Sequence, residues 1–388
     1  MASLLLAIIY LAFISLGLPD SLLGSAWPSM HLSLNVPLSH MGFISMIISG
    51  GTIISSVMSE RLTKKFTAKY VTVFSVFLTA AALFGFSASK SFSAVCVFAV
   101  PYGLGAGAID AALNNYVALH YNSRHMSWLH CFWGVGTIIS PYIMSYSLTR
   151  TDWHGGYRAV SFLQITITVI LLISLPLWKI NKTPDDKDSQ SDNILGIKGA
   201  LKIRGVPFQL IGFFAYCAAE STAIYWSGSY LSDTLKMSDK SAAALASLFF
   251  IGITVGRFIS GFISGKLGDL KMIRLSVTII TVGIILMLLP IKGNGSALVG
   301  LAVLGLGCAA VYPSVIHSTP NYFGRQNSSA IIGLQMACAY VGSTFIPPVF
   351  GAVTNITGTR IMPIFLTVFF IIMTVCLETV NKKVQLSK

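Results

Sequence analysis

Apolar runs long enough to cross a lipid bilayer follow one another along the whole chain, separated by short polar segments. A transmembrane helix needs about 20 predominantly apolar residues to span a hydrocarbon core of about 30 Å. The runs lie near residues 4–28, 40–59, 69–88, 92–119, 127–149, 159–179, 208–231, 241–264, 272–290, 295–318, 328–352 and 361–380. This pattern predicts an all-α integral membrane protein with twelve transmembrane helices.

One longer polar segment divides the chain near its middle. It runs from Ile180 to Val206, contains Lys182 and Asp185, and shows no apolar periodicity. Such a composition is typical of a flexible connection. We therefore predict a six-helix bundle at residues 1–179, a linker at 180–206 and a second six-helix bundle at 207–388.

The two halves of the chain also repeat one another. Shifting the sequence by 202 to 206 residues aligns glycines, a proline and loop cations, which set close helix packing, bends and sidedness. The aligned pairs are Gly51 and Gly256, Ser55 and Ser260, Arg61 and Lys266, Leu62 and Leu267, Gly103 and Gly305, Gly105 and Gly307, Gly136 and Gly342, and Pro141 and Pro347. Parallel six-helix repeats are typical of secondary transporters, so we expect two pseudo-symmetric bundles.

Composition and charge agree with insertion in a membrane. Of the 388 residues 54% are hydrophobic and 10% are charged, and the mean hydropathy of +0.75 is far from that of a soluble domain. The net charge of +13 comes from Lys and Arg residues that gather in the loops of one side. By the positive-inside rule this side is cytoplasmic, together with both termini and the linker. The positive charge is therefore a topology signal and indicates no nucleic-acid partner.

Other features exclude further classes of protein. The first apolar run lacks a basic stretch and a cleavage site, so we expect a spanning helix rather than a removable signal peptide. All six cysteines lie in apolar runs, which predicts neither a disulfide framework nor a metal site. No nucleophile with a base and no phosphate loop is present, so we expect no enzyme and no cofactor.

The segment from Pro101 to Asn115 is apolar and glycine-rich, yet it contains Asp110 and Asn114 on one helical stripe. An ionised Asp at the bilayer centre costs about 3 kcal/mol on insertion scales, so this carboxylate should face the protein interior. It either serves function or only holds helices together, and ionisable residues inside membrane segments favour function. Asp20 is expected to be a second buried carboxylate, or else a cap at the bend made by Pro19.

Residues 56–65 have the sequence SVMSERLTKK, which resembles the cytoplasmic motif between helices 2 and 3 of the major facilitator superfamily. It departs from the usual pattern at Ser56 and Thr63, where glycine is common, and at Glu60, where Asp is common. Residues 261–268 resemble the second copy, with Gly265 in place of the acid. The resemblance implies a role in conformational change for Glu60, Arg61, Lys65 and Lys266.

Four shorter segments are similar to the fucose permease branch of sugar:proton symporters: Gly17–Asp20, Asp110–Asn114, Leu129–Gly134, and Glu220 with Trp226. In that branch acids in helices 1 and 4 serve proton coupling and sugar binding, so the resemblance implies these roles for Asp20 and Asp110. We assign the proton to Asp20, whose neighbours are apolar, and sugar hydroxyls to Asp110, which shares its stripe with Asn114.

The remaining candidates follow from helix direction and from the chemistry of sugars. Helix 5 runs antiparallel to helix 4, so His130 should lie at the depth of Asn114, either as ligand or relay or as a packing residue. A binding site for a sugar needs aromatic rings that stack on the sugar, together with a few amide and acidic side chains. We expect substrate contacts from Asp110, Asn114, Asn115, His130, Glu220, Tyr225, Trp226, Tyr312, His317 and Gln335, and proton coupling from Asp20 and Asp110. Arg257 is expected to snorkel or to form a structural ion pair.

The sequence thus predicts a monomeric plasma-membrane transporter that imports a hexose or similar sugar with a proton, sodium being an alternative ion, by alternating access. A proton-driven exporter of drugs or metabolites on the same fold is the first alternative. A sugar sensor that does not transport is the second, although no loop longer than the linker is present to carry a signalling domain.

Overall fold

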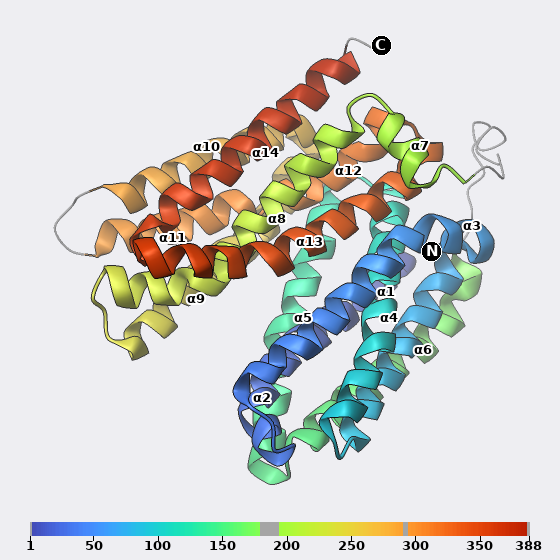
Figure 1. Ribbon diagram of the computed structural model, residues 1–388. Coiled ribbons are helices and arrows are strands. Elements are labelled where there is room, and N and C mark those ends of the chain that lie inside the picture. The colour runs from blue at the N-terminus through green and yellow to red at the C-terminus, as the bar shows by residue number, and fades with distance from the viewer. Residues whose placement is uncertain (1, 179–193, 290–293, 386–388) are drawn as a thin grey trace. The chain divides into compact units, whose positions relative to one another are not determined.

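A computed structural model describes residues 2–178, 194–289 and 294–385, and every regular element in these ranges is a helix (Figure 1). The helices form two compact units, one of residues 1–116 with 129–196 and one of residues 117–128 with 197–388. Residues 180–193 of the predicted linker lie outside the described residues. Its remaining part was expected to be flexible but contains a short helix, α7 (Gly196–Lys202).

The helices of the first unit are α1 (Ala2–Asp20), α2 (Leu22–Ser33), α3 (Met41–Ala88), α4 (Phe92–His120), α5 (Ser123–Arg150) and α6 (Trp153–Ser174), with the adjoining ends of α4 and α5 grouped in the second unit. The second unit contains α7, α8 (Val206–Ser229), α9 (Asp239–Leu267), α10 (Asp269–Leu288), α11 (Gly295–Cys308), α12 (Val311–Phe323), α13 (Arg325–Thr357) and α14 (Met362–Gln385).

Each of the twelve predicted spans lies in one helix or in two consecutive helices, and two of the spans share α3. Within the described residues, nine helical stretches are long and apolar enough to cross a membrane. One of them, Leu38–Ala88, holds two predicted spans, because α3 is kinked at Thr67, whose φ is 61°. The more polar helices α5, of 28 residues, and α8, of 24 residues, account for the other two. The predicted all-α membrane fold is confirmed.

Prolines explain two breaks inside spans. Proline has no N–H, so it leaves the carbonyl four residues earlier without its helical partner. In α1 this proline is Pro19, and the freed carbonyl of Ser15 accepts a bond from Gln164 Nε2 of α6 at 2.7 Å. Pro313 stands in the same relation to Ala309, at the break between α11 and α12. These breaks place backbone and side-chain polar groups in the middle of two spans.

Equivalent glycines make equivalent contacts in the two units. A Cβ added at Gly103 of α4 would overlap the carbonyl oxygen of Ile48 in α3, and one added at Gly305 of α11 would overlap that of Phe249 in α9. Gly136 of α5 and Gly342 of α13 repeat the relation, against the carbonyl groups of Ile14 and Phe214. Helix backbones approach this closely only where a side chain is absent. The internal repeat therefore preserves the same close helix crossings in both bundles.

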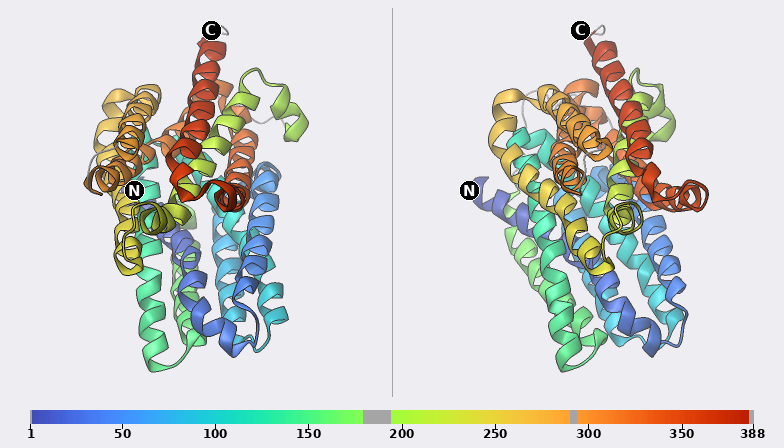
Figure 2. Two further views of the ribbon diagram at one scale, coloured as in Figure 1. Left: turned by 60° about the vertical axis from the view of Figure 1, so that its left-hand side comes forward. Right: turned by 90° about the vertical axis from the view of Figure 1, so that its left-hand side faces the viewer.

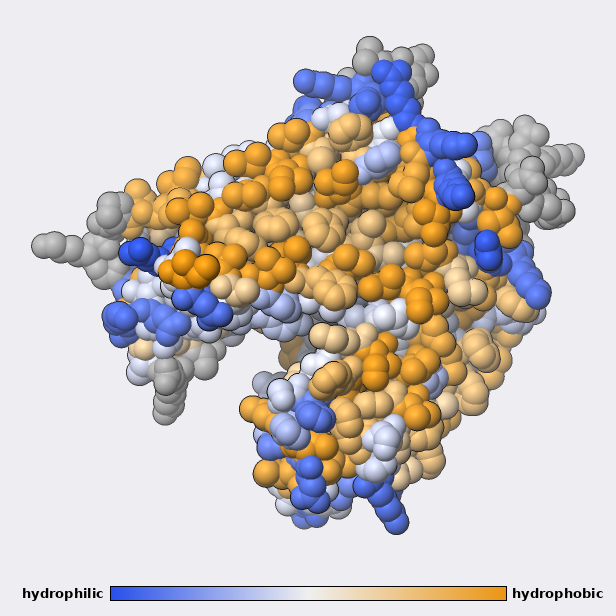
Figure 3. Space-filling model, in the orientation of Figure 1, coloured by the Kyte–Doolittle hydropathy of each residue, from blue (hydrophilic) through white to orange (hydrophobic). Residues whose placement is uncertain are grey.

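The outer surface of the second unit is apolar along its length. α8 packs against α13 and α14, which run along one face of this unit (Figures 1 and 2). Figure 3 shows that apolar side chains cover this face and that hydrophilic residues gather at its two ends. Ile364, Val368, Ile371 and Val375 of α14 are among the exposed apolar residues. A band of this kind is what a helix bundle presents to lipid.

Candidate functional site

Asp20 lies inside the first unit, where protein surrounds its carboxylate, yet part of its surface remains accessible. It ends α1, and its Oδ2 accepts a hydrogen bond from Trp133 Nε1 at 2.8 Å and its Oδ1 one from Tyr102 OH at 3.3 Å. Its carboxylate does not cap the bend, because these two bonds come from α4 and α5 and the cap position of α2 is Ser21. Asp20 therefore combines a partly accessible carboxylate with two aromatic side chains.

The exposure of Asp20 follows from its place on the helix. Asp20, Gly24 and Pro28 are all exposed and lie four residues apart, so they form one accessible stripe. Trp27 is excluded from this stripe, since it is only 2% exposed and donates from Nε1 to the carbonyl of Leu38. One stripe of the first span is therefore left uncovered by protein around Asp20.

Asp110, Asn114 and His130 form an enclosed hydrogen-bonded chain in the first unit. Asn114 Nδ2 donates to Asp110 Oδ1 at 2.8 Å, and His130 Nε2 lies 3.1 Å from Asn114 Oδ1. Because the amide oxygen can only accept, His130 carries a hydrogen on Nε2 in this arrangement. The expected contact between Asn114 and His130 is confirmed, and all three side chains are buried.

This chain joins two titratable groups through one amide. The ring of His130 also packs edge-on against Phe13 of α1, at a centroid distance of 5.4 Å. A change in the protonation of Asp110 or His130 changes the donors and acceptors that Asn114 meets, and its amide can respond by rotating. The three residues can therefore hold a proton and transmit its presence between α4 and α5.

A buried ion pair is the corresponding feature of the second unit. Arg257 Nη2 of α9 lies 3.4 Å from Glu220 Oε1 of α8, and both side chains are nearly enclosed. Tyr216, one turn before Glu220, donates from its hydroxyl to the carbonyl of Cys308 at 2.8 Å. Arg257 thus forms a structural ion pair, one of its two expected roles. A buried charge needs such a partner, because removing a lone ion from water costs several kcal/mol.

The remaining candidate residues differ in their partners and in their exposure. Tyr312 packs on Phe213 at a centroid distance of 4.8 Å, and Trp226 donates from Nε1 to the carbonyl of Pro347 at 3.0 Å. Tyr225 has 69% of its surface exposed. Gln335 is enclosed, and its Oε1 accepts a bond from Thr319 at 3.0 Å. Asn115, in the first unit, is half-buried next to the Asp110 chain.

His317 belongs to a different group of residues. Its Nδ1 lies 2.7 Å from Asp269 Oδ2 at the start of α10, and its Nε2 lies 3.0 Å from the carbonyl oxygen of Tyr121. Both ring nitrogens are therefore engaged at the loop end of α12. We leave His317 out of the proposed substrate site.

The cytoplasmic motif holds the start of α7. Glu60 Oε1 accepts the backbone N–H of Leu195 at 2.8 Å, and Glu60 Oε2 accepts that of Gly196 at 3.0 Å. Lys64 pairs with the same carboxylate at 3.0 Å. The other motif cations Arg61, Lys65 and Lys266 are exposed. Of these motif residues, Glu60 is the one that is buried and bound to a second chain segment.

Three partners of the site were not singled out from the sequence. Tyr102 lies in the glycine-rich segment, Asp269 begins α10 and binds His317 outside the proposed substrate site, and Arg257 was considered without its partner. The signal for Arg257 was available, since a cation inside a span requires an acid and Glu220 is the acid of the preceding helix. The partners of Asp20 depend on how three helices cross. The spacing of residues in the sequence therefore could not predict them.

Two repeated bundles of membrane-spanning helices, with acids and a buried ion pair inside them, define a transporter rather than an enzyme. The Major Facilitator Superfamily model matches residues 9–290 and 209–385, so the chain belongs to this superfamily.

Individual relatives are distant. The chain is 21% identical to Bypass of stop codon protein 6 of Saccharomyces cerevisiae, over 91% of this chain and 77% of that protein. It is 21% identical to the Glucose/mannose transporter GlcP of Bacillus subtilis, over 78% of this chain and 77% of GlcP. The crystal structure of the E. coli fucose:proton symporter FucP matches with a TM-score of 0.71 at 17% identity, covering 96% of this chain and 98% of FucP. The last match shows a shared fold.

Proposed function

We propose that the protein is a plasma-membrane importer that couples the uptake of a hexose or a related polyol to the entry of a proton. The observation that carries this proposal is the contact of the exposed Asp20 with the Trp133 indole, a carboxylate beside an aromatic ring. Aromatic faces cover the C–H faces of a sugar, and carboxylates accept its hydroxyl hydrogens. The sugar named for GlcP and the coupling named for FucP support the same class of cargo and ion.

The geometry favours reversing the two roles assigned from the sequence. That assignment rested on an apolar and buried Asp20, whereas part of the surface of Asp20 is accessible and Asp110 is enclosed. We therefore assign sugar hydroxyls to Asp20, with Trp133 as the ring platform. Tyr102, as a second donor, orients the carboxylate without supplying a compensating positive charge.

The enclosed chain of Asp110, Asn114 and His130 is then the proton-carrying group. Its members exchange hydrogen bonds across α4 and α5, so a proton held there changes how these helices meet. Binding a proton changes the net charge of the group by one. A proton site that lies apart from the sugar site is able to favour one conformation of the transporter.

Glu220 and Arg257 complete the proposal in the second unit. Their mutual pairing gives Glu220 a fixed orientation while leaving acceptor positions on its carboxylate for a sugar hydroxyl. Trp226, Tyr312 and Gln335 supply ring faces and an amide near the same helices. Tyr225 and Asn115, both partly accessible, are proposed as outer contacts.

Paired flux measurements in reconstituted vesicles test the assignment of the sugar to Asp20 and of the proton to the Asp110 group. Asp110→Asn keeps shape and hydrogen bonding but removes titration, so sugar counterflow should persist while accumulation driven by a pH gradient is lost. Asp20→Asn should weaken both fluxes by raising the apparent KM for sugar. Accumulation that persists in Asp110→Asn would remove the proton assignment. Sodium-dependent uptake would replace the ion, and pH-driven efflux of drugs with no sugar flux would make the protein an exporter.

A further inference from the structure

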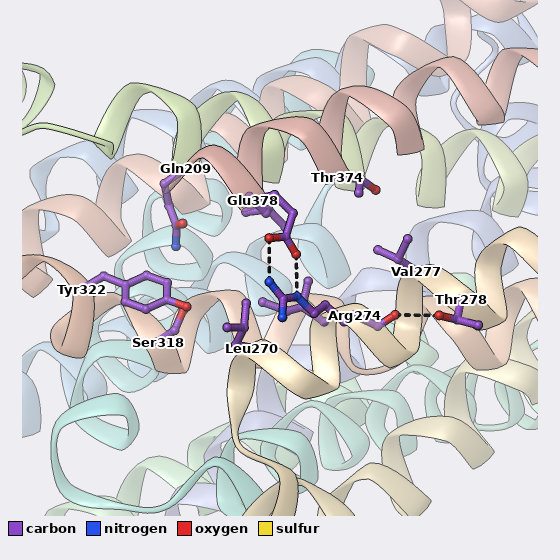
Figure 4. A pocket seen from close by; sticks show the side chains of 11 residues that line it. Gln209, Leu270, Arg274, Val277, Thr278, Ser318, Tyr322, Thr374 and Glu378 are labelled. Carbon is purple, nitrogen blue, oxygen red and sulfur yellow. Dashed lines mark hydrogen bonds and ion pairs between the residues drawn. The ribbon is translucent and has the colours of Figure 1, made fainter. Parts of the chain in front are cut away.

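A cavity of about 250 Å³ lies inside the second unit, between α10 and α14 (Figure 4). Side chains of α8 and α12 complete its lining, among them Gln209 and Tyr322. None of the residues proposed for sugar or proton binding lines it. The cavity is therefore a separate feature of this bundle.

Its polar side lies close to the end of the bundle that is rich in Lys. Arg274 is five residues from the start of α10, which at 1.5 Å per residue is about 7.5 Å. Lys271, Lys382 and Lys383 lie at the same ends of α10 and α14. Positive residues at helix ends mark the level of the lipid head groups on the cytoplasmic side.

Exposed apolar side chains lie on the two helices that flank the cavity, α10 and α14. Leu275 and Val282 of α10, and Ile371 and Val375 of α14, are exposed large hydrophobic residues. Such faces border acyl chains in a bilayer, so lipid molecules are expected next to these two helices.

The charged pair at the cavity has unused hydrogen-bonding capacity. Arg274 donates from Nε to Glu378 Oε1 at 2.7 Å and from Nη2 to Glu378 Oε2 at 2.9 Å. A guanidinium has five N–H donors and a carboxylate can accept about four hydrogen bonds, so each partner retains free positions. Tyr322 lines the same cavity, and its hydroxyl makes no hydrogen bond within the described part of the chain. The positively charged donors of Arg274 and the negatively charged acceptor Glu378 therefore lie next to each other.

We propose that this cavity binds a zwitterionic phospholipid with a primary ammonium head group. The lipid phosphate accepts hydrogen bonds from Arg274 and Tyr322, and the ammonium donates to Glu378. A volume of about 250 Å³ suits a head group rather than a whole lipid. A quaternary ammonium has no hydrogen to donate to Glu378, and an anionic head group brings no cation to it.

Native mass spectrometry of the full chain, titrated with phosphatidylethanolamine, phosphatidylcholine and phosphatidylglycerol of identical acyl chains, tests the proposal. We expect phosphatidylethanolamine to bind about threefold to tenfold more tightly than the other two lipids. One or two partly exposed charge contacts contribute an affinity difference of this size. The paired variant Arg274→Gln with Glu378→Gln should lose this preference. Lys271→Gln removes a charge from the same turn of α10, does not line the cavity and should retain it.

A second variant keeps the test decisive if the paired variant does not fold. Val277→Trp places a large ring in the cavity and should reduce phosphatidylethanolamine binding by at least fivefold while leaving the charged pair in place. Equal binding of the three lipids, an equal loss in Lys271→Gln, or unchanged binding in Val277→Trp would each overturn the proposal. Tighter binding of phosphatidylglycerol or of inorganic phosphate, lost with Arg274 alone, would replace it by a simple anion site.

Discussion

Glu60 and Leu195 join two parts of the chain that are 135 residues apart, through a carboxylate oxygen that accepts the Leu195 N–H at 2.8 Å. Glu60 stands where the superfamily motif usually has Asp, and its carboxylate also accepts the N–H of Gly196. Lys64 balances its charge from one turn further along α3. The acidic residue of the motif therefore anchors the segment that leads into α7, and this segment is fixed at its end.

The first prediction concerns this anchor. Glu60→Gln replaces one acceptor oxygen by an NH₂ group that faces a backbone N–H, so we expect a loss of about 1–3 kcal/mol of stability. Limited proteolysis should also become faster between residues 194 and 205. The measurements are the thermal unfolding midpoint in detergent and the cleavage rate. The exposed neighbour offers the control Arg61→Gln, and equal stability of the two variants would show that the anchor contributes nothing.

The second prediction uses two glycines of α5. A Cβ at Gly136 would overlap the carbonyl oxygen of Ile14, whereas a Cβ at Gly134 would meet nothing within 4 Å. Gly136→Ala should destabilise the protein by about 1–3 kcal/mol through overpacking, and Gly134→Ala should be neutral or stabilising by up to about 1 kcal/mol through helix propensity. Thermal unfolding of both variants measures the contrast. Equal midpoints would contradict the close crossing of α1 and α5.

Much of the fold could be predicted because it depends on the local composition of the sequence. The apolar runs locate the spans, and the aligned pairs Gly103 with Gly305 and Gly136 with Gly342 anticipate the equivalent crossings. The helix break next to Pro19 follows from a missing N–H. Such features depend on a few consecutive residues or on a repeat, and both are visible in one sequence.

The site could be predicted only in part, because its geometry depends on crossings between distant segments. The prediction that His130 lies beside Asn114 is correct, because the two residues are on consecutive antiparallel helices joined by a short loop. The exposure of Asp20 could not be derived, because it depends on which stripe of the first span stays uncovered. The same holds for His317, whose partner Asp269 lies 48 residues away.

The third prediction concerns pH and the loop before α6. Partial burial acts to raise the pKa of Asp152, but hydrogen bonds from the Gly155 N–H and from His154 lower the pKa below its ordinary value. A carboxylate with a depressed pKa stabilises the fold above its unfolded pKa, and this contribution disappears as the pH falls through the folded pKa. Asp152→Ala should lose about 1 kcal/mol of helix capping near neutral pH.

The measurement for Asp152 is the unfolding midpoint of the wild type and of Asp152→Asn between pH 3 and pH 7. Asn retains an N-cap oxygen but does not titrate, so the difference between the two proteins should shrink at the acidic end. A difference that grows toward acid would reverse the sign of the coupling.

The fourth prediction concerns sidedness, which rests on the distribution of Lys and Arg. Single cysteines at Ser189, which lies outside the described residues, and at Asn294 should react with an impermeant reagent from opposite sides of the membrane. The background should be a chain whose own six cysteines have been replaced. Labelling of both positions on intact cells would show that the predicted cytoplasmic placement of the linker is wrong.

The last prediction separates structural and substrate roles of Glu220 and Arg257. Removing one partner leaves the other as an uncompensated buried charge, so Glu220→Gln or Arg257→Gln alone should destabilise the protein by about 3–5 kcal/mol. The double variant Glu220→Gln with Arg257→Gln leaves no buried charge and should recover most of this loss. If Glu220 also accepts a sugar hydroxyl, the folded double variant should still show a raised KM for sugar, because an amide oxygen is a weaker acceptor than a carboxylate. Thermal unfolding and counterflow, measured on the same preparations, distinguish these contributions. Recovery of both stability and transport would make the pair purely structural, whereas full stability in the two single variants would contradict the buried pair itself.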